Sequence, residues 1–354
     1  RHILFQTYLY QQLDPVDRSR RHAALGAALE NLYAGETQIV AQHAGELARH
    51  FEAGGLLLKA ATYALQAGQQ AVYRAASRVA VTHYRHGLAL LADQPQTPER
   101  SRLEARLYLG LGAPFLIANN WGGSERWEAI EQAMQRIRAL GTPADRQEFL
   151  AALFLQATWL NSQGETRQVT RLGEQMLALS KNQTGPAWVL AQRTLGTAYM
   201  FQGHFSKARK HLEEAFRVYQ AIGPQQIPKA AVHNLETIDR AGLGFSLAAA
   251  GYPDQGWQQA AQAIAMARSQ PPPILGSVII LASEIAILRG DLPQFESLSH
   301  ELIHLGNAEA MHYFQAYGSG NQGYARVLAA TQAEGAEADE MAQGGLKEIQ
   351  RGWQ

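Results

Sequence analysis

The chain contains 354 residues, 46% of them hydrophobic, and its 31 lysines and arginines balance its 31 aspartates and glutamates. This composition can supply an extended core and is unlike that of a disordered protein, while zero net charge gives no overall attraction for nucleic acid. The absence of cysteine excludes disulfides and thiolate chemistry, and it suits a reducing, cytoplasmic compartment.

Residues 1–36 predict a short helical lead-in. Asp14-Pro15 suits the start of a helix, because proline fits the first turn, where an amide hydrogen would have no partner. The helix that follows is expected to turn one apolar face inward, formed by Leu25, Ala28, Leu29 and Leu32.

Residues 37–95 predict the first helical repeats. Apolar and small side chains recur there at the spacing of two amphipathic helices, at Leu47, Ala48, Phe51, Gly55, Ala60, Ala64 and Ala67. A further helix is expected at 75–91. The segment 93–98 contains two prolines and is the predicted linker to a longer array of repeats, residues 99–354.

The repeat pattern is clearest at residues 189–222, which predict two helices joined at Gly203. Leu195 and Tyr199 share one face of the first helix, and a positive φ at Gly203 would end it. Gly196 and Ala208 are small where the two helices would cross closely. The order Leu-Gly-x-x-Tyr followed by Ala resembles the tetratricopeptide repeat, a helix-turn-helix unit.

Other repeat turns are expected at Gly164, Gly251, Gly290 and Gly335. Together with Gly203, the last four turns are 48, 39 and 45 residues apart, which is longer than the minimal repeat of about 34 residues. No segment alternates like a strand, and polar residues interrupt the most apolar run, 274–288, so no membrane helix is predicted. The predicted fold class is all-α, a right-handed α-α superhelix with a short helical lead-in.

A wider resemblance rests on the order of several segments: Ile3-Leu-Phe-Gln-Thr-Tyr-Leu-Tyr10, Ala48-Arg-His-Phe51, Lys59-Ala-Ala-Thr-Tyr63 and Gln66-Ala-Gly68. This order resembles the repeat region that follows the ATPase core in bacterial signal-transduction ATPases of the STAND type. The resemblance implies a nucleotide-binding domain before residue 1, often with a class III nucleotide cyclase, a protein kinase or a DNA-binding domain. It also implies that residues 1–36 are the tail of a winged-helix-like segment. The chain itself has no phosphate-binding Gly-x-x-x-x-Gly-Lys-[Ser/Thr] loop.

The predicted binding surface is the groove lined by the first helix of each repeat. By register, the groove residues are Arg106, Leu109, Phe154, Thr158, Asn161, Arg193, Thr197 and Met200, followed by Phe245 and Glu284. Such a mixture suits a peptide segment or a modest ligand, although packing or solvent exposure is the alternative for many of these residues. Trp121 and Trp127 flank a Gly-Gly joint and are interpreted as packing beneath it, with a partner contact as the alternative.

One motif suggests an enzyme instead, because His300-Glu301-Leu302-Ile303-His304 matches H-E-x-x-H. His300 and His304 would share a helix face and hold zinc, with Glu301 as the general base. The repeat register, however, places both histidines on the outward face of a second helix. A zinc-dependent hydrolase is therefore the alternative to a binding module, and a solvated face is the preferred interpretation.

The sequence favours a non-catalytic sensor or scaffold module of a larger signalling ATPase, with no metal or other cofactor. Its expected partner is a protein, a domain of the same parent chain, or a small ligand. Neither nucleic acid nor a membrane is an expected partner. An inducer-binding module of a STAND transcriptional activator is a second alternative, which a DNA-binding domain beyond either end would support.

Overall fold

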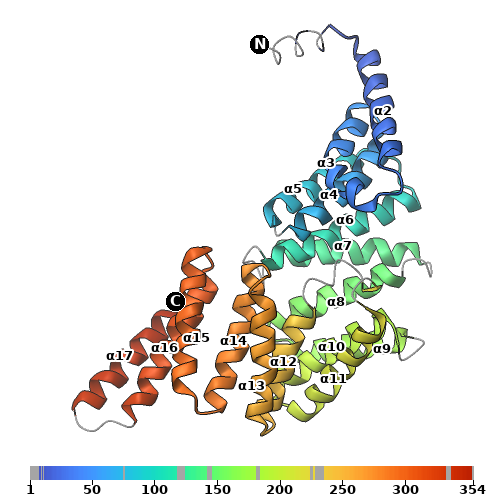
Figure 1. The fold of residues 1–354 in the computed structure, drawn as a ribbon. Coiled ribbons are helices and arrows are strands. Elements are labelled where there is room, and N and C mark those ends of the chain that lie inside the picture. The colour runs from blue at the N-terminus through green and yellow to red at the C-terminus, as the bar shows by residue number, and fades with distance from the viewer. Residues whose placement is uncertain are drawn as a thin grey trace. The chain divides into compact units, whose positions relative to one another are not determined.

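A computed structural model describes residues 8, 10, 12–74, 76–117, 124–141, 146–180, 184–223, 226–227, 235–331 and 336–352. In these ranges the regular elements are all helices, as predicted (Figure 1). The chain forms two compact units, residues 1–159 and 160–354, and each is considered by itself. None of the described helices is both long enough and apolar enough to cross a membrane.

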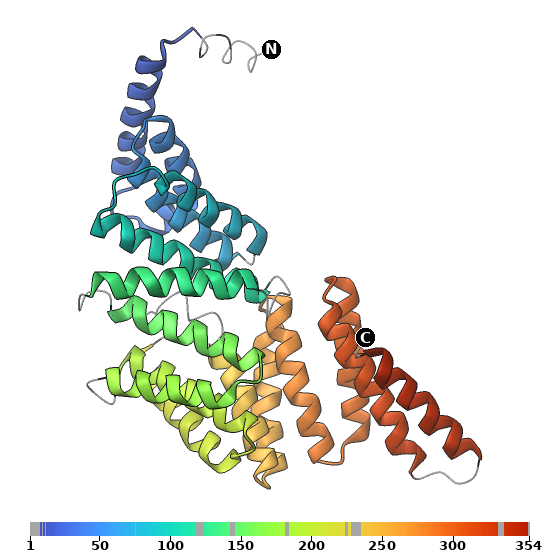
Figure 2. The ribbon, with the colours of Figure 1, turned by 180° about the vertical axis from the view of Figure 1, so that it is seen from behind.

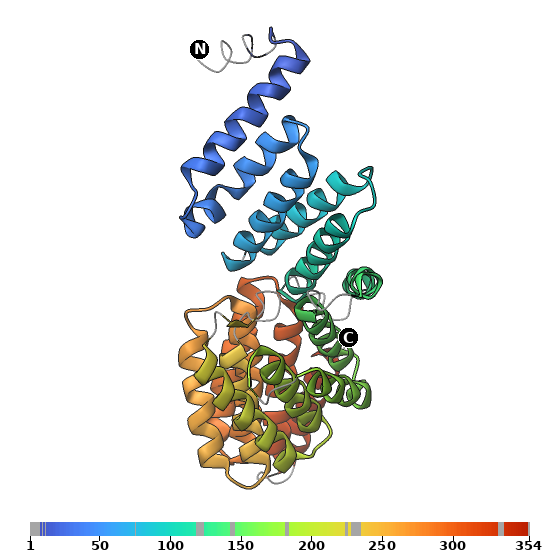
Figure 3. The same cartoon turned by 90° about the vertical axis from the view of Figure 1, so that its right-hand side faces the viewer.

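The first unit begins with the predicted lead-in and continues with paired helices. Its helices are α2 (Pro15–Leu32), α3 (Thr37–Ala53), α4 (Leu57–Tyr73), α5 (Ser77–Leu91), α6 (Pro98–Ile117), α7 (Ser124–Leu140) and most of α8 (Arg146–Ser162). Consecutive helices from α2 to α7 pack on one another, and α4 also contacts α6. Figure 3 shows these helices layered in chain order.

The second unit repeats the same arrangement. Its helices are α9 (Thr166–Leu179), α10 (Pro186–Phe201), α11 (Phe205–Ile222), α12 (Leu235–Ala249), α13 (Pro253–Ala267), α14 (Pro272–Leu288), α15 (Leu292–Ala308), α16 (His312–Ala330) and α17 (Ala336–Gly352). Each first helix packs on its own second helix, and α12 also packs on α14. Seen from behind, α12 to α15 lie side by side (Figure 2).

The predicted turns join these helices. At Gly203 φ is 76°, and the amide of His204 donates to the carbonyl oxygen of Tyr199 at 2.8 Å. Glycine is suited to this left-handed conformation because it has no side chain to clash with the backbone. Gly164, Gly251 and Gly290 also have positive φ, and Gly335 lies outside the described residues. The close crossing at Gly196 is present too, since a β-carbon there would lie 2.7 Å from Leu212 Cγ.

The lead-in helix α2 differs from its prediction. Leu25 and Leu32 are 47% and 72% exposed, and Ala28 is exposed as well. Gly26 instead faces α3, where a β-carbon would lie 3.1 Å from the ring of Phe51. Leu29 alone of the four predicted residues packs inward, against the core cluster of α3 and α4, and Glu30 bonds Lys59 and Tyr63 of α4. The rest of the apolar face points outward because, within the described residues, α2 is the first helix of the stack.

The predicted linker 93–98 lies between α5 and α6, whose buried residues share one core cluster containing Tyr84, Leu91, Leu103 and Leu107. The predicted divisions at residues 36 and 95 stay predictions. Gly306 and Asn307 suggest a helix break by sequence, but α15 continues through both residues, and Gly306 is buried. A β-carbon at Gly306 would lie 2.5 Å from the backbone nitrogen of Gln315, so the small residue allows α16 to approach closely.

Candidate functional site

Three predicted groove residues form polar contacts between successive first helices. Arg106 on α6 pairs with Glu148 on α8 at 2.7 Å, and Arg193 on α10 pairs with Asp239 on α12 at 2.5 Å. On α16, the hydroxyl of Tyr317 donates to Glu284 of α14 at 2.7 Å. The register therefore places these residues on the face shared by first helices, where their polar atoms connect one repeat to the next.

The pair of Arg193 and Asp239 is nearly removed from water, with side chains 13% and 9% exposed. Burial raises the pKa of Asp239, and the guanidinium of Arg193 partly offsets that rise. A buried ion pair whose partners come from neighbouring repeats holds those repeats together. The two charges pair with each other inside the protein and are not accessible to a ligand.

The apolar groove residues are buried, which favours packing, the alternative stated for them. Leu109, Phe154 and Met200 retain only 3%, 4% and 7% exposure. The reason is visible in α10, which packs against α9, α11 and α12 and therefore buries residues on several of its faces. These three side chains contribute to packing and present no accessible surface to a partner.

The remaining groove residues are mostly bonded to their own surroundings. The hydroxyl of Thr158 accepts from Arg126 at 2.5 Å and donates to the carbonyl of Leu155 at 2.8 Å. Arg126 is fully buried, and burial lowers its pKa to about 10. Thr197 donates to the carbonyl of Arg193 at 3.0 Å, and Asn161 is half-buried.

Accessible aromatic surface lies instead on α16. Tyr313, Tyr317 and Tyr324 form what we call the tyrosine stripe, because their spacing places them on one face of the helix. Tyr313 is 54% exposed and Tyr324 is 42% exposed. Between Tyr317 and Tyr324 lies Gly320, where an added β-carbon would meet no atom within 4 Å. The predicted groove residue Phe245 packs in the same core cluster as Tyr317.

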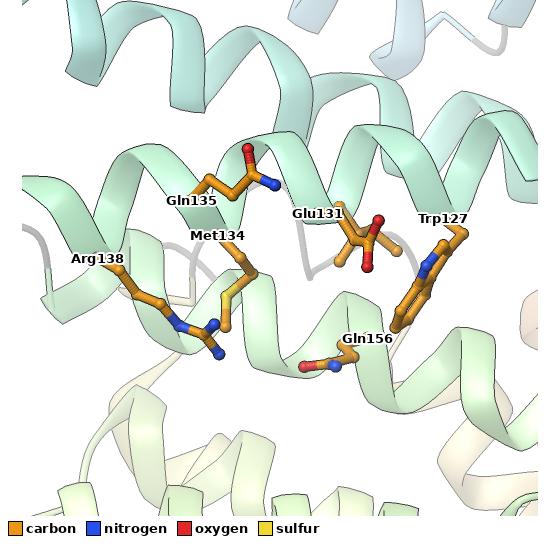
Figure 4. Close-up of a pocket in the computed structure, with 7 residues that line it drawn as sticks. Trp127, Glu131, Met134, Gln135, Arg138 and Gln156 are labelled. Carbon is orange, nitrogen blue, oxygen red and sulfur yellow. The ribbon is translucent and has the colours of Figure 1, made fainter.

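A small crevice lies between α7 and α8 in the first unit (Figure 4). It has a volume of about 130 Å³ and is lined by Trp127, Ile130, Glu131, Met134, Gln135 and Arg138 of α7 and by Gln156 of α8. Figure 4 shows Trp127, Glu131 and Arg138 extending from α7 into the space where Gln156 lies. Trp127 closes one end and packs on Trp159, with ring centroids 4.4 Å apart.

Sequence reasoning considered Trp127 but missed the other residues of the crevice. The predicted joint with Trp121 lies outside the described residues, and the described partner of Trp127 is Trp159 of α8. A signal was present, because Trp127, Glu131, Met134 and Arg138 follow i, i+4, i+7 and i+11 and so share one helix face. An alternation of apolar and charged residues along one helix face is the pattern that would have revealed it.

The H-E-x-x-H motif lies on α15. Both histidines are exposed, as the register predicted; His300 contacts the side-chain amide of Gln322 at 3.0 Å, and Glu301 pairs with Arg268 at 3.2 Å. Among the described residues, no three histidine, aspartate or glutamate side chains are grouped so that they could hold a metal ion. The described part of the chain brings no third ligand to this pair, and the zinc-hydrolase interpretation stays a prediction.

No family model and no curated protein sequence matches the chain. Its fold is similar to that in the crystal structure of the apo form of RapI, with a TM-score of 0.53 over 83% of this chain and 98% of that chain. The identity is 13%, so this similarity shows the fold alone. A crystal structure of BtubC from P. vanneervenii matches at 14% identity over 85% of this chain and 94% of that chain, but its TM-score of 0.30 carries no argument. The predicted fold class, an all-α superhelix of tetratricopeptide-like repeats, is confirmed.

Proposed function

We propose that this chain is a non-catalytic recognition module that binds a segment of a protein. The observation that carries the proposal is the tyrosine stripe, since two of its three rings are about half exposed on a first helix of the repeat array. Tyrosine is enriched in protein interfaces because its ring supplies contact area while its hydroxyl still forms hydrogen bonds. An aromatic row of this kind favours a partner over plain solvent contact.

The surroundings of the stripe support recognition rather than catalysis. Burial, and secondarily the carboxylate of Glu284, raise the pKa of Tyr317, so its hydroxyl stays protonated and donates to Glu284. This hydrogen bond fixes the middle ring, while the space at Gly320 admits a partner side chain or backbone. A fixed aromatic ring reduces the entropy that binding must otherwise cost.

The resemblance to STAND-type ATPases supports a signalling role for this module. In such a role the bound partner is a separate protein or a domain of the same parent chain. Binding shifts a switch only if the partner prefers one arrangement of the parent over another, because equal affinity for both changes no population. The module would then act as a sensor or scaffold for an ATPase-linked output, and an inducer-responsive transcription regulator is one form of that output.

The test places a photoreactive benzoylphenylalanine at Tyr313 in cells that make the protein, with the same substitution at Tyr73 as a control. Tyr73 is 78% exposed and lies outside the stripe, in the first unit. We expect one defined peptide to be cross-linked from position 313 and not from position 73. Gly320→Arg, which fills the open space in the stripe, should abolish that adduct. Identical adducts from both positions, or none from position 313, contradict the proposal.

The zinc-hydrolase alternative needs its own readout. Stoichiometric zinc in the purified protein, together with a hydrolytic activity that Glu301→Gln removes, would favour it. The ion pair between Glu301 and Arg268 is partly exposed, so this substitution should leave the fold intact.

A further inference from the structure

The crevice between α7 and α8 carries chemistry that the proposed function does not use. Its volume of about 130 Å³ is below the roughly 300–1,000 Å³ of pockets that enclose a drug-sized molecule. A nucleotide or an organic cofactor therefore does not fit inside it. A space of this size accepts one side chain, and its lining by Trp127, Ile130 and Met134 suits an apolar one.

The crevice is also lined by two side chains of opposite charge, Glu131 and Arg138. Glu131 and Arg138 are exposed, and within the described residues neither makes a salt bridge or a hydrogen bond. Two other arginines of the first unit, Arg100 and Arg136, both pair with Glu104. Glu131 and Arg138 are seven residues apart on one helix, which separates them by roughly 10.5 Å along its axis.

Two side-chain amides complete the lining. Gln135 comes from α7 and Gln156 from α8, and no hydrogen bond joins either of them to another described residue. A carboxamide both donates and accepts, so it matches the free N–H and C=O groups of a main chain. An extended segment has such groups free, whereas a helix uses its own internally.

From these features we propose that the crevice binds an extended segment of a protein, which carries an acidic and a basic residue three positions apart and an apolar residue between them. The apolar side chain enters the crevice, the acidic residue meets Arg138, and the basic residue meets Glu131. In a polyproline-II conformation, residues i and i+3 lie on one edge roughly 9.3 Å apart, close to the separation of the two charges. This site is separate from the tyrosine stripe and goes beyond the proposed function.

Fluorescein-labelled octapeptides of four kinds test the proposal by fluorescence anisotropy at low salt. Their central residues are Glu-Pro-Leu-Lys, Lys-Pro-Leu-Glu, Glu-Pro-Leu-Glu or Lys-Pro-Leu-Lys, and a fifth peptide replaces leucine with glycine. We expect the native protein to bind one of the two mixed-charge peptides about fivefold more tightly than either uniform one, since each exposed ion pair contributes a small factor. Loss of leucine should weaken binding further.

Charge reversal makes the test independent of absolute affinity. Glu131→Lys should shift the preference to the peptide with two glutamates, and Arg138→Glu should shift it to the peptide with two lysines. Glu128→Lys is the matched control, because Glu128 is exposed on the same helix and does not line the crevice; it should keep the native preference. A preference order that is the same in all four proteins, or equal binding of the glycine peptide, overturns the proposal. A changed preference requires a folded protein, so unfolding cannot imitate the expected result.

Discussion

The ion pair on α10 and α12 and the charges of the crevice use the same chemistry in opposite ways. Arg193 and Asp239 are buried together and connect two repeats, whereas Glu131 and Arg138 are exposed and separated on a single helix. The register of the repeats favoured Arg193 as a ligand contact and overlooked Arg138. The comparison teaches that, in a repeat array, a charged side chain is available to a partner only if no neighbouring helix carries an opposite charge that reaches it.

The largest expected effect comes from breaking the buried pair. Asp239→Ala should lower the free energy of unfolding of the second unit by about 3–5 kcal/mol, because Arg193 would keep its charge away from water without this carboxylate. Glu131→Ala should change stability by less than about 0.5 kcal/mol, since an exposed charge is replaced. Urea unfolding followed by circular dichroism, with hydrogen exchange to locate the change, measures both.

A double substitution serves as the control. Arg193→Met with Asp239→Leu removes both charges and keeps apolar volume, so it should recover most of the lost stability. If Asp239→Ala and Glu131→Ala had similar effects, the distinction between a structural pair and available charges would be wrong.

The helical repeats and their turns could be predicted from the sequence because both depend on local patterns. Leu195, Tyr199 and Gly203 fix helix faces and a turn within a few residues of one another. The partner of Arg193 lies 46 residues away, and that distance in sequence is set by how two repeats stack. No local pattern contains this information.

Local patterns also fail to show that the apolar residues of the predicted groove are buried. Met200 and Phe154 lie on first helices at positions that a minimal repeat would leave open, yet neighbouring helices cover them. The prediction for α2 fails in the opposite sense: its apolar face is predicted to be buried, but Leu32 is exposed. Periodicity identifies an apolar face, but only the number of neighbouring helices decides whether it is buried.

An intermediate effect on stability is expected from alanine substitutions at two glycines of α16, Gly318 and Gly320, which lie two residues apart. A β-carbon at Gly318 would be 2.8 Å from the carbonyl oxygen of Ser299 on α15, whereas one at Gly320 meets nothing. Gly318→Ala should destabilise the second unit by about 1–3 kcal/mol through overpacking. Gly320→Ala should stabilise it by up to about 1 kcal/mol, because alanine is the better helix former.

Thermal unfolding of the two variants beside the native protein gives the answer. Equal shifts in the same direction would mean that α15 and α16 do not approach as closely as the structure shows. The two variants also compare a buried surface with an accessible one, since Gly318 lies in the interface between α15 and α16 and Gly320 lies in the tyrosine stripe.

The smallest expected effect is a difference between the two units in how much folding stability each loses in acid. Burial lowers the pKa of His50 and His83 in the first unit and of His211 in the second. A histidine with a lowered folded pKa binds fewer protons in the folded state, so its stabilisation is complete above the unfolded pKa of about 6.5 and is lost as pH falls. Both units should therefore be less stable at pH 5.5 than at pH 7.5.

The second unit should lose less, because burial lowers the pKa of His211 there and of both His50 and His83 in the first unit. The raised pKa of Asp239 acts in the same direction as that difference, since the folded state binds a proton there more readily than the unfolded chain. Hydrogen exchange at both pH values, corrected for the intrinsic exchange rate, reports each unit separately. In His211→Gln the second unit should become nearly insensitive to this change of pH, while the first unit keeps its full loss. A larger loss in the second unit than in the first would contradict this prediction, because the first unit holds two of the three histidines whose pKa burial lowers.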